Sequence, residues 1–229
     1  MELWHVPLRI TADTADRVQA CLDATERGRA ARFRRPADRL AYIAAHVALR
    51  SLLARKLGRQ PHELRFVGGA EGKPALAPPH DALEFNLSHS AGFGLVGLAE
   101  SRPVGVDIEA WDVGAVAVQG EDSLDAVLSP AEREAIAACD PASRPLARLR
   151  CWVRKEALLK AAGCGLSDEV RQVSVDVGAE ARLLASTHAR LRQGDWSVRA
   201  FEQAGSWSAA VATGGAMPPV TIHHWTWSA

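Results

Sequence analysis

Residues 104–109 read Val-Gly-Val-Asp-Ile-Glu, and this short alternation determines how the second half of the chain is built. Side chains two apart on a strand share one face, so the valines and Ile108 are predicted to face a core. Asp107 and Glu109 then share the opposite face, roughly 7 Å apart along the strand. Like charges at this spacing repel, so a compensating positive group is expected nearby. Alone, however, such a pair is more typical of a solvated strand edge than of a site.

The composition is that of an ordinary globular protein, with 229 residues, 48% of them hydrophobic, and 27 basic against 27 acidic residues. The zero net charge argues against general nucleic-acid binding. No apolar run approaches the length that spans a membrane, and the first residues lack a basic, apolar leader. The four cysteines have no metal-finger spacing, which favours free thiols in the cytoplasm.

Periodicity and capping signals predict both helices and strands. Pro36 begins a helical pattern that ends at Leu57, before the capping position Gly58. Ser129-Pro130-Ala131-Glu132 is a capping box that begins another helix, and residues 148–162 form a third. Strands are expected near residues 3–10, 64–67, 85–87, 94–99, 104–109, 172–177, 196–201, 207–212 and 221–225.

The two halves of the chain repeat the same order of elements, helix, strand and hairpin. Residues 91–99 and 204–212 also resemble each other, although small-residue hairpins can do so by chance. We therefore predict an α+β fold of two similar halves related by pseudo-twofold symmetry. Each half is expected to be a small antiparallel sheet packed on helices, with an active-site cleft between them. The predicted boundaries are residues 1–103 and 104–229.

Three further stretches carry chemistry only in combination. Residues 152–160 form an amphipathic helix in which Glu156 and Lys160 are one turn apart, an arrangement that alone indicates a surface ion pair. Residues 86–90, Asn-Leu-Ser-His-Ser, suit an anion site or, equally, a turn capped by serines. Residues 72–74, Gly-Lys-Pro, are an ordinary turn by themselves.

Taken together, these stretches resemble the 4′-phosphopantetheinyl transferase superfamily, and specifically its Sfp-like branch, which activates peptide and polyketide synthetases. The matching stretches are 72–74, 85–90, 105–109 and 152–166. The last of them matches the pattern W-x-x-K-E-A-x-x-K-x-x-G-x-G-L without a gap, from Trp152 to Leu166.

The resemblance implies a role for each matching residue. The implied magnesium ligands are Asp107, Glu109 and Glu156, with Mn²⁺ as a substitute metal. Lys160 is implied to contact the pyrophosphate of coenzyme A, with Lys155 nearby, and both are candidate catalytic residues with Glu156 and His89. The remaining candidates for binding coenzyme A are Ser88, His89, Gly72, Lys73, Pro74, Arg29 and Arg50.

The implied reaction transfers the phosphopantetheine arm to a serine of an apo carrier protein and releases 3′,5′-adenosine bisphosphate. The implied carrier is a peptidyl, polyketide acyl or fatty-acid acyl carrier, and Glu156 is a hypothetical base for its serine. Carrier proteins are acidic around this serine. A basic face is therefore expected to dock them, with residues 111–128 as its apolar part, and the candidate cations are Arg144, Arg148, Arg150 and Arg154.

Two other classes of function fit parts of the pattern. A different magnesium-dependent phosphotransferase is one, but its nucleotide loop is missing from the sequence. A non-catalytic module that binds coenzyme A or a carrier protein is the other. Cys151 and Cys164 are expected to pack in a core, because no activating histidine is placed near them. A two-half chain completes its site alone, so a monomer without nucleic-acid or membrane partners is expected.

Overall fold

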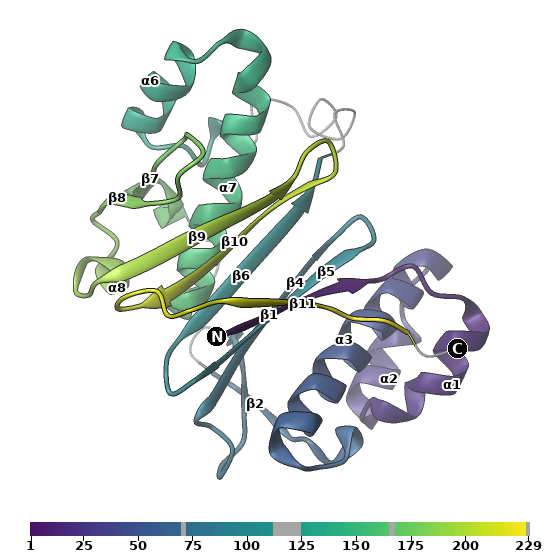
Figure 1. Cartoon of the computed structure of the whole chain (residues 1–229). Helices are drawn as coiled ribbons and strands as arrows, with labels where there is room; N and C mark the ends of the chain where they lie inside the picture. The colour runs from purple at the N-terminus through teal and green to yellow at the C-terminus, as the bar shows by residue number, and fades with distance from the viewer. Residues whose placement is uncertain (70–71, 112–124, 165–167, 228–229) are drawn as a thin grey trace.

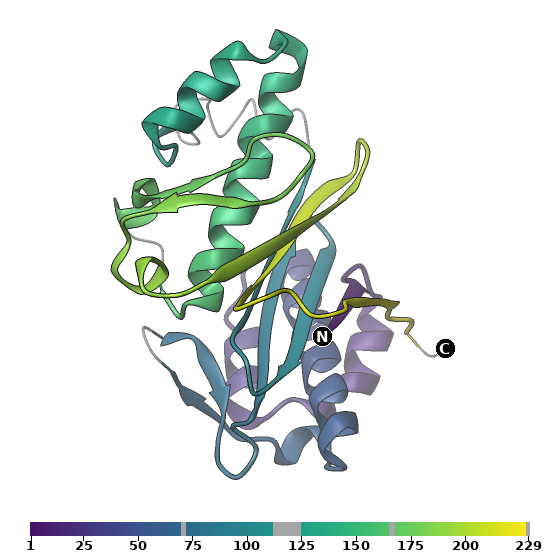
Figure 2. The same cartoon turned by 60° about the vertical axis from the view of Figure 1, so that its left-hand side comes forward.

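The computed structural model describes residues 1–69, 72–111, 125–164 and 168–227, and its fold is α+β. Helices gather at the two ends of the molecule, and the strands lie between them (Figure 1; Figure 2). Within the described part, no helix has the length and apolar character needed to cross a membrane. The predicted fold class is confirmed.

Both halves run through a strand, helices, a two-stranded ribbon and a hairpin, and the second half adds α8 and β11. The first half contains β1 (Glu2–Pro7), α1 (Ala12–Val18), α2 (Ala24–Ala30), α3 (Pro36–Leu57), β2 (Phe66–Gly68), β3 (Pro74–Leu76), β4 (Leu83–Ser90) and β5 (Phe93–Glu100). The second contains β6 (Val104–Ala110), α6 (Pro130–Ala138), α7 (Arg144–Ala161), β7 (Val173–Val175), β8 (Leu183–Ser186), α8 (Ala189–Arg192), β9 (Trp196–Gln203), β10 (Trp207–Gly214) and β11 (Thr221–His224).

The strands of the two halves also pair in the same pattern. The described strands of the first half pair as β1-β5-β4, and those of the second half pair as β6-β10-β9, all antiparallel. Each half adds a two-stranded ribbon, β2-β3 or β7-β8. The repeated topology agrees with the predicted duplication, whereas the twofold relation of the halves stays a prediction.

Local sequence signals place most elements correctly. The helix from Pro36 to Leu57 is confirmed, and Gly58 adopts the left-handed conformation that ends it. The capping box at Ser129 and Glu132 is also confirmed. The hairpin is longer than predicted because residues 88–90 continue β4 instead of forming its turn. The predicted last strand exists as β11.

One predicted boundary is crossed by a strand. After β10 the chain returns to the first sheet, where β11 pairs in parallel with β1 (Figure 1). Trp225 N donates to His5 O at 2.9 Å, and the indole of Trp227 donates to Pro7 O at 2.8 Å. The last strand thus belongs to the first sheet, although it follows the second half in the sequence. The division into residues 1–103 and 104–229 stays a prediction.

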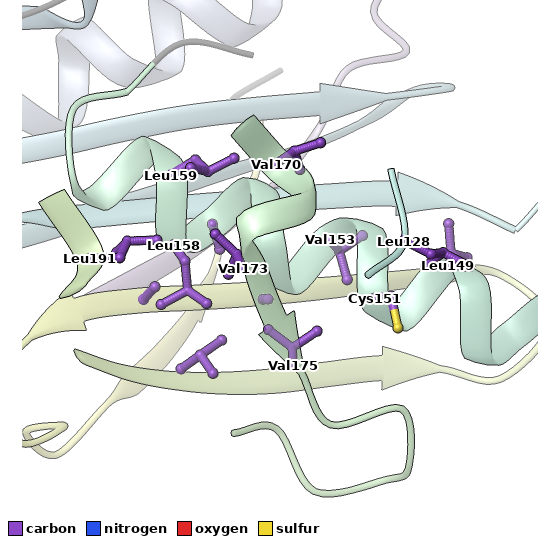
Figure 3. Close-up of a cluster of buried hydrophobic side chains, with 14 of the residues drawn as sticks. Leu128, Leu149, Cys151, Val153, Leu158, Leu159, Val170, Val173, Val175 and Leu191 are labelled. Carbon is purple, nitrogen blue, oxygen red and sulfur yellow. The ribbon is translucent and has the colours of Figure 1, made fainter. Parts of the chain in front are cut away.

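Three apolar clusters set the layers that position the site. In the first, α3 packs on one face of the first sheet, and the cluster includes Leu52 of α3 and Phe85 of β4. In the second, the other face of that sheet packs on β6 and β10, as Leu3 and Leu95 contact the valines of β6. In the third, α7 is enclosed by β7, β9, β10 and α6, and Cys151 lies in this cluster as predicted (Figure 3).

Gly105 sets the distance between α7 and β6. A Cβ atom at Gly105 would lie 2.1 Å from the Ala157 carbonyl oxygen and 2.2 Å from the Ala161 backbone nitrogen. Backbone atoms cannot move aside as a side chain can. Because Gly105 has no side chain, the backbone of α7 can pack directly against β6, the strand that carries Asp107.

Gly105→Ala is expected to lower the free energy of unfolding by about 1–3 kcal/mol or more, because the added methyl group must push the helix away. Urea unfolding measures the loss. Gly68→Ala is the matched control, since a Cβ atom there meets nothing within 4 Å. Equal losses in the two variants would mean that Gly105 does not set this contact.

Candidate active site

The edges of the two main sheets are joined by side chains of β4. Val106 N donates to Asn86 Oδ1 at 2.8 Å, Ile108 N to Ser88 Oγ at 3.4 Å, and Ala110 N to Ser90 Oγ at 3.2 Å. Successive bonds lie two residues apart on both strands, because alternate residues of a strand share one side. The bonds satisfy backbone donors of β6 that face β4 and fix β6 beside it (Figure 2).

Four polar side chains meet on the α7 side of β6. Ser88 Oγ donates to Asp107 Oδ1 at 2.8 Å, and Lys160 Nζ lies 2.6 Å from the same oxygen. Lys160 Nζ is also 3.7 Å from Glu156 Oε2. Asp107 is only 2% and Glu156 6% exposed. The structure thus brings the strand carboxylate, the helix carboxylate and one lysine of the predicted site into contact.

The protonation of the two glutamates reflects this crowding. Burial raises the pKa of Glu156 to about 7; the charge of Lys160 opposes the rise, and Asp107 and Glu109 add to it. Burial also raises the pKa of Glu109, against hydrogen bonds from Ser90 and Trp152. Both groups would be stabilised in their charged form by a further cation.

The carboxylates fit a divalent cation by their chemistry. Asp107 Oδ2 and Glu156 Oε1 are buried and have no hydrogen-bond partner in the described structure. Such orphaned oxygens are costly unless a cation binds them. Among the described residues, no three acidic, histidine or cysteine side chains are already grouped as a finished metal site. Lys160 instead bridges Asp107 and Glu156, so a metal would have to share these oxygens with it.

A hollow of about 470 Å³ opens beside this cluster, on the α3 side of β4. One wall is a stack in which the rings of Tyr42 and His46 lie 4.1 Å apart and the Arg29 guanidinium lies 5.7 Å from the Tyr42 ring centroid. Pro74 and His89 line the hollow on the strand side. Three predicted coenzyme A residues, Arg29, Pro74 and His89, therefore share one cavity.

The rest of the predicted Gly-Lys-Pro stretch lies at the β2-β3 turn. Gly72 has φ of +84°, a conformation that favours glycine. Lys73 Nζ donates to Val104 O at 2.8 Å and so ties this turn to the start of β6. Gly165 and Leu166 of the helix motif lie outside the described residues.

The prediction that Lys155 contacts phosphates is not supported by its position. Its side chain is fully buried, 2.6 Å from Glu132 Oε2. Its Nζ also donates to the carbonyl of Val127 at 2.8 Å. Lys155 and Glu156 are adjacent on the helix and therefore point in different directions, about 100° apart. Lys155 joins α7 to α6 and is removed from the site.

Arg50 is a second correction, for the same reason. Its side chain is fully buried and pairs with Asp23 and Glu26 of the α2 capping box. It also donates to the carbonyls of Pro61 and Leu64 at 2.7 and 3.0 Å. These contacts use four of the five guanidinium donors, and the side chain is fully buried, so Arg50 is not placed to meet a phosphate.

Sequence reasoning missed several residues around the site. Asn86 and Ser90 hold β6 through its backbone, and their alternation with Ser88 is the signal that would have revealed this. Tyr42 and His46 form the wall of the hollow. They are one helical turn apart, a spacing that predicts a shared face but not what the face meets.

Comparison with known proteins agrees with the motifs. A family model for the 4′-phosphopantetheinyl transferase superfamily matches residues 103–212. A second, described as 4′-phosphopantetheinyl transferase, N-terminal, matches residues 10–101.

Individual relatives carry the same family name. The 4′-phosphopantetheinyl transferase HetI of Nostoc is 30% identical over 173 residues, which cover 73% of this chain and 70% of that protein. A 4′-phosphopantetheinyl transferase of Bacillus subtilis is 30% identical over 72% of this chain and 71% of its own length. A Synechocystis protein provisionally given the same name is 33% identical, and the match spans 63% of it. The resemblance seen in the motifs is confirmed, and the chain belongs to the 4′-phosphopantetheinyl transferase superfamily.

Proposed function

We propose that this protein transfers the 4′-phosphopantetheine arm of coenzyme A to a serine of an apo carrier protein and releases 3′,5′-adenosine bisphosphate. The observation that carries the proposal is the buried group of Ser88, Asp107, Glu156 and Lys160 beside the hollow at His89. An acidic cluster next to a lysine suits a substrate that carries anionic phosphates and arrives with a metal.

Coenzyme A fits this arrangement by charge. It carries about four negative charges, two on the pyrophosphate and nearly two on the 3′-phosphate. In the proposed binding mode the adenosine part occupies the hollow of Arg29, Pro74 and His89. The pyrophosphate then crosses the edge of β4 to reach Lys160.

The proposed metal is Mg²⁺, with Asp107, Glu109 and Glu156 as the protein ligands. Mg²⁺ prefers carboxylate and phosphate oxygens, and when bound it offsets the repulsion between the carboxylates and the pyrophosphate and draws charge from the β-phosphate. The orphaned oxygens of Asp107 and Glu156 support this assignment.

The protein's own part in the reaction is positioning and proton transfer. Glu156 accepts the proton of the carrier serine as its oxygen bonds to the β-phosphorus, and the bond from that phosphorus to the bridging oxygen breaks. Lys160 stabilises the charge that develops on the leaving bisphosphate.

The transfer reaction is tested by mass spectrometry of an apo carrier protein incubated with the enzyme, coenzyme A and Mg²⁺. The expected result is a carrier heavier by one phosphopantetheine arm. Replacing the carrier serine with alanine, or adding a chelator, is expected to abolish the gain. Absence of the gain on several peptidyl and acyl carriers would contradict the proposal.

A further inference from the structure

The arginines first expected to dock the carrier are already engaged. The Arg150 guanidinium makes two bonds to the Glu202 carboxylate, at 2.6 and 2.8 Å, and Arg148 pairs with Asp125 at 2.7 Å. Arg154 is fully buried against backbone carbonyls that include Gly178 O, at 2.7 Å. Arg144 donates to two carbonyls at the end of α6. Most of residues 111–128 lie outside the described structure.

A different set of cations is free. Residues 31–39, which include the link from α2 to α3 and the first turn of α3, are exposed throughout. Within the described structure, no ion pair or hydrogen bond holds a guanidinium in this stretch. We call the exposed set the arginine face, and it consists of Arg32, Phe33, Arg34, Arg35 and Arg39.

One residue of the arginine face is poorly suited to its local structure, although Pro36 and Asp38 in the first turn favour the helix. Arg35 is the N-cap residue of α3 and makes no side-chain capping bond. Serine, threonine, aspartate and asparagine are favoured at this position, and positive charge near a helix N-terminus is unfavourable. A residue choice that opposes local stability is typical of a functional surface.

An apolar hollow lies between this face and the end of the β4-β5 hairpin. Its volume is about 580 Å³, and Phe33, Leu40 and Tyr42 line one side. His89 and Gly92, at the end of the β4-β5 hairpin, line the other. Phe33 itself is 37% exposed, and its ring lies 5.2 Å from that of Tyr42. Tyr42 and His89 also line the hollow proposed for coenzyme A, so a partner seated here lies next to that hollow.

We propose that the arginine face docks the acidic carrier protein, with an apolar carrier side chain in the hollow beside Phe33. The proposal rests on the proposed transfer reaction, which requires the carrier serine to approach Asp107 and Glu156. Complementary charge is the reason for choosing an acidic carrier, since exposed arginines flank the exposed Phe33 in the sequence. Complementary charge affects the rate of association and the orientation of the bound carrier more than the rate of the chemical step.

The test is steady-state transfer kinetics of the double variant Arg34→Glu/Arg35→Glu, with carrier and coenzyme A varied separately. The expected result is a KM for the carrier raised about tenfold or more, with kcat and the KM for coenzyme A within about twofold of the wild type. Phe33→Ala is expected to raise the carrier KM as well, because it empties one wall of the hollow. Thermal unfolding checks that each variant is folded.

The matched control is Arg59→Glu/Arg65→Glu, which makes the same change of charge at exposed positions. Arg59 follows the other end of α3, a helix of 22 residues and therefore roughly 33 Å long. The KM of this control variant for the carrier is expected to stay near the wild-type value. Transfer by the wild type is expected to depend more strongly on salt than transfer by Arg34→Glu/Arg35→Glu.

Three results would overturn the docking proposal. They are an unchanged carrier KM in both arginine-face variants, an equal rise in the control, and a rise confined to the KM for coenzyme A. The last would place the face in the nucleotide site instead. If the wild-type protein modifies no carrier, the proposed reaction itself is contradicted. If the wild type transfers normally and the arginine-face variants are unaffected, only the docking proposal is contradicted.

Discussion

Asp107→Asn is expected to lower kcat/KM for transfer by about 10²–10³-fold, the cost of removing one stabilising group from a catalytic centre. The carboxylate is 2% exposed, accepts from Ser88 at 2.8 Å and lies 2.6 Å from Lys160 Nζ. Asparagine keeps the shape but loses the charge that holds both Lys160 and the proposed metal. Transfer kinetics measure the loss, and titration with Mn²⁺ is expected to show weaker metal binding by the folded variant.

Two controls make this result interpretable. Asp13→Asn removes a carboxylate that is 83% exposed and pairs with the partly exposed Arg17, so transfer is expected to be unchanged. Glu156→Gln is expected to lower kcat as well, because Glu156 is proposed both to bind the metal and to accept the serine proton. Near-normal turnover of Asp107→Asn would remove this residue from the metal site. Near-normal turnover of Glu156→Gln would move the base elsewhere.

The parts of the site that could be predicted from the sequence depend on local periodicity. Alternation along residues 104–109 places Asp107 on the face opposite the valines, and the structure has it so. The helical spacing of Glu156 and Lys160 predicts one shared face, and in the structure Lys160 contacts both Glu156 and Asp107. Two local patterns thus fix three side chains, once the strand and the helix pack together.

The errors concern charged residues that the fold buries. Sequence patterns treat Arg50 and Lys155 as exposed cations, because charged groups are seldom fully buried. In the structure each one bonds to the capping-box glutamate of the preceding helix, Glu26 or Glu132. Both capping boxes are visible in the sequence. Their long-range partners are not, since the pairing depends on how two helices pack.

The same limit applies to the end of the chain. Residues 221–224 have the composition of a strand, and a strand forms there. Its partner is β1, more than two hundred residues earlier, and it pairs in parallel. Periodicity specifies that a strand has an edge to satisfy but not which edge it meets.

Lys155→Met is expected to lower the free energy of unfolding by about 3–5 kcal/mol, which is the cost of leaving one charge of a buried ion pair alone. The partner Glu132 is also buried, and it cannot turn to solvent because its carboxylate accepts from Ser129 N at 2.7 Å and Val175 N at 2.8 Å. Burial lowers the pKa of Lys155, and the charge of Glu132 opposes that shift. Urea unfolding at neutral pH measures the loss.

The double variant Lys155→Met/Glu132→Gln separates this ion pair from general damage to the core. It removes both charges and keeps a side-chain oxygen for one of the backbone donors, so it is expected to recover much of the lost stability. Lys56→Met breaks a partly exposed pair with Glu2 and is expected to cost about 1 kcal/mol or less. A loss of similar size in Lys56→Met and Lys155→Met would contradict the structural role assigned to Lys155. Only a larger loss in Lys155→Met that the second substitution relieves fits a lysine whose function is to hold α6 on the helix of Glu156.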